Sequence, residues 1–66
     1  MREPLEIHKD FNEAVVEFWH SDENRPFAKV HADELRVYED RIEVYSRDYS
    51  YPIIIVREYD WWREAA

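Results

Sequence analysis

The sequence predicts one small domain that is mainly β, either all-β or α+β, built as an antiparallel meander of four or five strands with at most one short helix. Several short segments alternate apolar and polar residues with period two, as half-buried strands do. Runs of β-branched and aromatic residues are separated by clusters of Ser, Asp, Asn and Pro, which favour turns. The chain has 66 residues, so we expect residues 1–66 to form a single domain, whose sheet can curl toward a small barrel.

The first third of the chain contains a short strand and one ambiguous segment. Residues 5–9 alternate apolar and polar side chains and predict a strand. Residues 10–20 begin with Asp10 and Glu13, which resemble a helix capping box, and the apolar residues that follow fit helical spacing. The end of the same segment, Val15–His20, is rich in β-branched and aromatic residues, which is typical of a strand.

A second strand-like run favours the β interpretation of that segment. Residues 27–32 follow the turn-prone residues 21–26, and a hairpin is the simplest way to join the two runs. We therefore favour a strand over a helix at this point, although the sequence leaves both open.

The clearest element is a hairpin between residues 35–38 and 42–45. A two-residue loop fits at Glu39–Asp40 or at Asp40–Arg41, and without glycine a longer or type I loop also stays open. We favour Glu39–Asp40, because it places Arg36 opposite Glu43, a favourable cross-strand pair. Because side chains alternate along a strand, this register puts four aliphatic residues on one face, namely Leu35, Val37, Ile42 and Val44. We expect that face to line the core.

The last third combines the most β-prone segment with a predicted helical turn. Ile53–Val56 is apolar at four consecutive positions, which predicts burial on both faces, either as a central strand or between a helix and a partner. Residues 57–59 are expected to continue the strand, and Ile54 is expected in the core. Asp60 can cap a short helix over residues 61–66.

The charge balance limits the classes of partner. Sixteen acidic and nine basic residues give a net charge of -7, which repels nucleic acid and anionic membranes and attracts basic proteins. The longest apolar run has four residues, far below the ~20 of a membrane span. The first residues lead into no apolar segment of a signal peptide, so we expect a cytoplasmic protein. There is neither cysteine nor glycine, which excludes thiolate sites and glycine-rich phosphate loops.

No residue pattern predicts a catalytic, cofactor or metal site. The histidines at positions 8, 20 and 31 lack the close spacing of a metal site. The acidic pairs at 22–23, 33–34 and 39–40 lack the alternating ligands of a calcium loop. The three serines have no nucleophile-elbow motif around them. We therefore expect no enzymatic activity.

The aromatic and acidic residues predict a protein-binding surface. Tyrosine, tryptophan and arginine are enriched at binding hot spots, and a single-layer sheet leaves one face open to a partner. Two tyrosines fall on the hairpin face opposite the aliphatic residues, and other aromatics cluster near the C-terminus. The candidate partner-binding residues are Tyr38, Glu39, Asp40, Glu43, Tyr45, Tyr59, Trp61 and Trp62.

The leading functional hypothesis is a small, acidic, non-enzymatic protein-interaction module. In size and charge alone it resembles the inhibitors or decoys that phages and other mobile elements use against host nucleic-acid-binding proteins, and this resemblance implies a basic protein partner. One alternative is a homo-oligomeric structural module, a homodimer formed through the apolar last third. The other is a designed scaffold without a natural function, which the missing glycine favours and the untidy turns disfavour.

Overall fold

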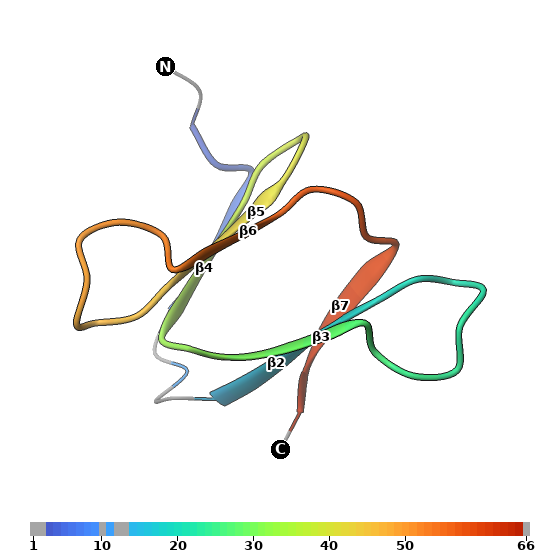
Figure 1. The fold of residues 1–66 in the computed structure, drawn as a ribbon. Helices are drawn as coiled ribbons and strands as arrows, with labels where there is room; N and C mark the ends of the chain where they lie inside the picture. The colour runs from blue at the N-terminus through green and yellow to red at the C-terminus, as the bar shows by residue number, and fades with distance from the viewer. Residues whose placement is uncertain (1–2, 10, 12–13, 66) are drawn as a thin grey trace.

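The computed structural model describes residues 3–9, 11 and 14–65, and this part of the chain is all-β with no helix. It confirms the mainly β class, with seven short strands in place of the four or five expected (Figure 1). The strands are β1 (Glu6–His8), β2 (Ala14–Trp19), β3 (Ala28–Ala32), β4 (Glu34–Val37), β5 (Ile42–Tyr45), β6 (Ile54–Val56) and β7 (Trp61–Ala65).

The strands form two antiparallel sheets. Sheet A has the order β1-β4-β5-β6, and sheet B has the order β3-β2-β7. Only Asp33 separates β3 from β4, so the chain passes from one sheet to the other at this residue (Figure 1). The Asp33 N–H donates to the carbonyl of Tyr45 at 2.9 Å, and its carboxylate accepts from the backbone N–H of Arg47 at 2.8 Å. These bonds fix the bend to the end of β5.

The predicted hairpin is confirmed with its register. Arg36 pairs with Glu43, and the Tyr38 N–H donates to the Arg41 carbonyl at 2.7 Å, which leaves a two-residue loop at Glu39–Asp40. The aliphatic face lies on the core side as expected: Leu35, Ile42 and Val44 are fully buried, and Val37 is half-buried against them.

The favoured hairpin near the N-terminus is also confirmed. β2 pairs with β3, with Val16 opposite Val30 and Phe18 opposite Ala28. The proposed helix start at positions 10 and 13 lies outside the described residues. The first predicted strand is β1, which pairs with β4 at one edge of sheet A.

The helix expected over residues 61–66 is wrong for the described residues 61–65, which form strand β7. This strand pairs with β2, with Trp61 opposite Trp19 and Trp62 opposite Phe18. Burying one face of β7 against the core outweighs the local helix propensity. Asp60 caps no helix: its carboxylate accepts the backbone N–H of Ser21 at 2.6 Å, and its own N–H donates to the Trp19 carbonyl.

The central, doubly buried placement of Ile53–Val56 is also wrong. β6 is an edge strand of sheet A, opposite the edge formed by β1, because β7 pairs with β2 and not with β6. Val56 is 6% exposed, whereas Ile53, Ile54 and Ile55 are 38%, 37% and 42% exposed. Ile54 is therefore not a core residue. The strand ends at Val56, so residues 57–59 do not continue it.

The core lies between the two sheets. Its fully buried side chains come from both sheets, and half-buried residues such as Tyr59 and Trp62 pack around them. The ring of Phe18 contacts Tyr59 edge-on, with centroids 6.2 Å apart. The buried hydrophobic cluster consists of Val16, Phe18, Ala32, Leu35, Ile42, Val44 and Val56.

Candidate functional site

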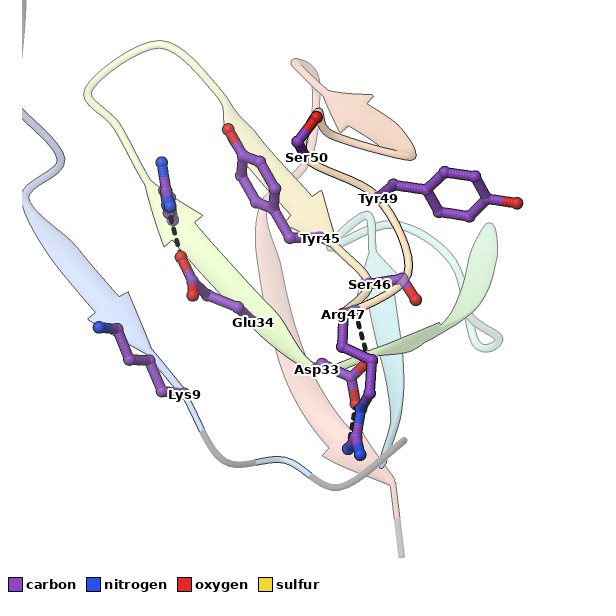
Figure 2. A pocket seen from close by; sticks show the side chains of 9 residues that line it. Lys9, Asp33, Glu34, Tyr45, Ser46, Arg47, Tyr49 and Ser50 are labelled. Atoms are coloured by element: carbon purple, nitrogen blue, oxygen red, sulfur yellow. Dashed lines mark hydrogen bonds and ion pairs between the residues drawn. The ribbon is translucent and has the colours of Figure 1, made fainter.

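A polar cavity of about 620 Å³ lies over the outer face of sheet A, beneath the loop that follows β5 (Figure 2). Figure 2 shows Lys9 on one side of it and Tyr49 and Ser50 on the other, with Glu34 and Tyr45 between them. Its lining comprises Lys9, Asp33, Glu34, Arg36, Tyr45, Ser46, Arg47, Tyr49 and Ser50.

The charges in this cavity are largely paired within the chain. The Arg36 guanidinium donates to the Glu34 carboxylate, and the Arg47 guanidinium donates to Asp33 at 3.0 Å. A charged ligand would have to compete with these ion pairs. The cavity therefore offers no preformed set of free charges and is a weak candidate for a ligand site.

The outer face of β4 and β5 is a continuous network of arginine, glutamate and tyrosine. The Tyr45 hydroxyl donates to Glu43 at 2.7 Å, and the Arg41 Nε donates to the other oxygen of that carboxylate at 2.9 Å. The Arg36 guanidinium lies 4.3 Å from the centroid of the Tyr45 ring, and Arg41 lies 4.0 Å from that of Tyr38. Each carboxylate on this face therefore has an arginine partner.

Burial and the neighbouring charges shift the titration of this network. Burial, together with the hydrogen bond to Glu43, raises the pKa of Tyr45 to about 12. For Glu43, burial acts to raise the pKa, but the hydrogen bonds from Tyr45 and Arg41 outweigh it and the pKa lies below its usual value. At neutral pH the phenol is a donor and the carboxylate an acceptor.

The predicted partner-binding residues do not form one surface. Six lie on or beside sheet A or in the core: Tyr38, Glu43 and Tyr45 on the outer face of sheet A, Glu39 and Asp40 in the β4–β5 loop, and Tyr59 against Phe18. The other two, Trp61 and Trp62, lie in sheet B, on β7 beside β2. Trp61 lies on the outer face of that sheet, and Trp62 on its inner face. Tyr38 is only 9% exposed, since Arg41 covers its ring.

Glu17 lies on β2, the central strand of sheet B, and places a buried carboxylate on the outer face of that sheet. Its cross-strand neighbours are Arg63, whose Nε donates to it at 2.7 Å, and Lys29, whose Nζ lies 3.8 Å away. The Trp19 indole also donates to it at 3.3 Å and stacks on Trp61, with ring centroids 4.6 Å apart. Direct cross-strand pairs of this kind stabilise a sheet, so this face holds β7 onto β2.

This arrangement predicts a pH dependence of stability. The hydrogen bond from Arg63 lowers the pKa of Glu17, outweighing the opposing effect of burial. A lowered pKa in the folded state stabilises the fold above the unfolded-state pKa of about 4.3, and this stabilisation is lost as the pH falls through the folded-state pKa. Urea unfolding should therefore show a drop in stability below that pH that is smaller in Glu17→Gln and in Arg63→Gln. If both variants lost as much stability on acidification as the wild type, this assignment would be contradicted.

One arrangement combines residue types of a catalytic triad without its geometry. His20 and Ser21, which follow β2, lie beside Asp60, which precedes β7. The His20 Nδ1 is 3.9 Å from the Asp60 carboxylate, which is beyond hydrogen-bond reach. The His20 ring instead stacks on the Phe27 ring, with centroids 4.2 Å apart. No hydrogen bond joins the Ser21 hydroxyl to the imidazole in the described contacts, so this trio offers no activated nucleophile.

Among residues 3–9, 11 and 14–65, no group of three or more His, Asp or Glu side chains could hold a metal ion. The same part of the chain contains no helix that could cross a membrane. No family model, curated protein or solved structure matches this chain. Its function must therefore be inferred from its own surfaces.

The edge strand β6 is a surface that the predicted partner-binding residues miss. Ile54 and Ile55 of this strand are exposed together with Ile53, which directly precedes it, and Tyr51, two residues before Ile53, is 60% exposed. Single exposed apolar residues are normal, but a contiguous group marks an interaction site. The run of isoleucines is evident in the sequence, but its apolar composition predicts burial and not exposure at an edge.

The hydrogen-bond pattern of sheet A shows how the backbone of β6 is oriented. Tyr38 and Arg41 form a hydrogen-bonded pair. Along an antiparallel ladder such pairs alternate with non-hydrogen-bonded pairs, whose backbone groups point away from each other. Ile42 and Val44 therefore direct their backbone groups toward β6, as the 2.8 Å bond from the Ile53 N–H to the Val44 carbonyl also indicates. Ile54 and Val56 pair with these two residues.

It follows that Ile55, between them, directs its N–H and C=O away from the sheet. Both groups lie at an open strand edge beside an exposed apolar side chain. This is the arrangement that accepts a further strand.

Proposed function

We propose that this protein is a non-enzymatic, cytoplasmic protein-interaction module that binds an extended segment of a partner alongside β6. The observation that supports the proposal is the open edge at Ile55, where backbone donor and acceptor face outward between exposed isoleucines. In strand addition, backbone hydrogen bonds supply affinity and alternate side chains supply specificity. Here the alternate side chains of the partner would meet Ile53 and Ile55 on one face and Ile54 on the other.

The charge distribution directs this proposal toward β6 and away from the acidic residues of sheet A. Glu34 and Glu43 on the outer face are paired with Arg36 and Arg41. A basic partner docked on that face would meet charges that already cancel locally. The nucleic-acid decoy that the net charge of -7 suggests therefore stays a prediction.

Ile55→Lys is expected to weaken strand addition at β6. A lysine at a sheet edge opposes further pairing, and the exposed position leaves the fold intact. Peptides selected from a displayed random library against the immobilised wild-type chain should be extended, rich in β-branched residues, and at least about tenfold weaker toward Ile55→Lys. The readout is the dissociation constant of each synthetic peptide.

The matched control is Ile7→Lys. Ile7 is 49% exposed on β1, and it lies on the same row of sheet A as Ile55, across Arg36 and Glu43, but at the opposite edge. The selected peptides should bind this variant as they bind the wild type. Peptides that bind Ile55→Lys and wild type equally would show that β6 is not the binding edge.

A further inference from the structure

We infer that the strand bound at β6 is β6 of a second copy of this chain, in an antiparallel, two-fold symmetric pair centred on Ile55. This inference rests on the proposed function of the β6 edge and names its partner. It joins the two copies of sheet A into one continuous eight-stranded sheet, since each copy contributes the four strands of sheet A.

The edge is complementary to itself about that centre. In an antiparallel pair with the two-fold axis at Ile55, the outward N–H of Ile55 in each copy donates to the outward C=O of Ile55 in the other. Ile54 then lies opposite Val56 of the second copy, and Ile53 lies opposite Arg57. An apolar side chain thus meets an apolar one or the aliphatic stem of an arginine at every position.

Burial supplies the driving force for this pairing. The isoleucines at 53–55 are 37–42% exposed, and in a 66-residue chain a single core leaves little spare stability. Ile54 lies on the core side of sheet A, opposite Val44, but at the open edge, so a strand added there would cover it. Small domains commonly gain such cover by oligomerisation.

Charge favours a second copy over a basic foreign partner. Residues 51–56 contain no acidic or basic side chain, and the two residues that follow, Arg57 and Glu58, have opposite charges. A basic partner would find no carboxylate along this strand. From residue 51 to residue 56 the contact between copies is uncharged, and Arg57 contributes its aliphatic stem opposite Ile53, while each copy as a whole carries a net charge of -7.

This charge pattern gives the dimer a distinctive salt dependence. Two subunits of like charge repel each other over distances of about one Debye length, which is ~8–10 Å at physiological ionic strength. Added salt screens this repulsion without weakening an apolar contact. The dimer should therefore become tighter with salt, whereas binding of an acidic surface to a basic partner would become weaker.

Analytical ultracentrifugation of the whole chain over micromolar to millimolar concentrations tests the inference. The wild type should pass from 8.2 kDa to twice that mass, at lower concentration when sodium chloride is raised. Ile55→Lys should raise the dimer dissociation constant at least about tenfold, whereas Ile7→Lys should leave it within about twofold. Amide hydrogen exchange should show the Ile55 N–H becoming protected as the dimer forms.

A wild-type chain that stays monomeric at all these concentrations would overturn the inference, as would equal weakening by Ile7→Lys. The two proposals fail separately. If selected peptides still bind β6 in an Ile55-dependent way while the chain stays monomeric, only the second-copy inference falls. If neither peptides nor a second copy bind in this way, the proposed function falls as well.

Discussion

Phe18→Ala is expected to unfold most of the protein at room temperature. Phe18 is fully buried near the end of β2, and its ring lies against those of Tyr59 and Phe27. Truncation of a buried phenylalanine costs about 3–5 kcal/mol. That is comparable to the whole stability of a domain of this size, about 3–5 kcal/mol. Circular dichroism and urea titration should show a largely unfolded variant.

The matched control is Phe27→Ala. Phe27 is 39% exposed and lies beside Phe18, with ring centroids 6.5 Å apart. Its truncation should cost about 1 kcal/mol, typical of a substitution outside the core. Phe18→Leu provides an intermediate that stays folded and can be measured. Equal losses for the two alanine variants would show that the core is not centred on β2.

Elements specified by local patterns could be predicted from the sequence. The β4–β5 hairpin follows from period-two alternation on both sides of a short polar loop, and the Arg36–Glu43 pair selects its register. The strand at β2 follows from the density of β-branched and aromatic residues and from the second run after the turn at residues 21–26. In each case the decisive contacts lie within about twenty residues along the chain.

The errors lie where the partner strand is distant in sequence. Ile53–Val56 has the composition of a central strand, but which strand lies beside it depends on the pairing of β7 with β2. Asp60 and the helix-forming residues after it favour a helix locally. The opportunity to pack Trp62 on the core overrides that preference, since tertiary context regularly outweighs propensity.

The candidate site shows the same division. Alternation correctly placed Tyr38 and Tyr45 on the face away from the core. It could not show that Arg41 and Arg36 cover their rings, because a cation–π contact depends on side-chain conformation. The open edge of β6 was equally beyond local reasoning, since it is defined by the absence of a neighbouring strand in sheet A.

Trp62→Ala should destabilise the protein far more than Trp61→Ala, although the two residues are adjacent. Trp62 is half-buried on the inner face of β7, packs on the core and contacts the His8 ring edge-on at 4.9 Å. Trp61 is 40% exposed on the outer face and stacks on Trp19. Neighbouring side chains of a strand point to opposite faces, so one tryptophan lies in the core and the other does not.

The expected cost of Trp62→Ala is toward the lower end of about 3–5 kcal/mol, because the side chain is only partly buried. Trp61→Ala should lose chiefly its aromatic stack, about 0.5–1.5 kcal/mol. Urea unfolding followed by circular dichroism measures both without relying on the deleted fluorophores. A helix over these residues would place the two side chains only about 100° apart, and the two substitutions would then cost more similar amounts of stability. Comparable destabilisation by the two variants would therefore contradict the strand assignment of β7, and with it the open edge at β6.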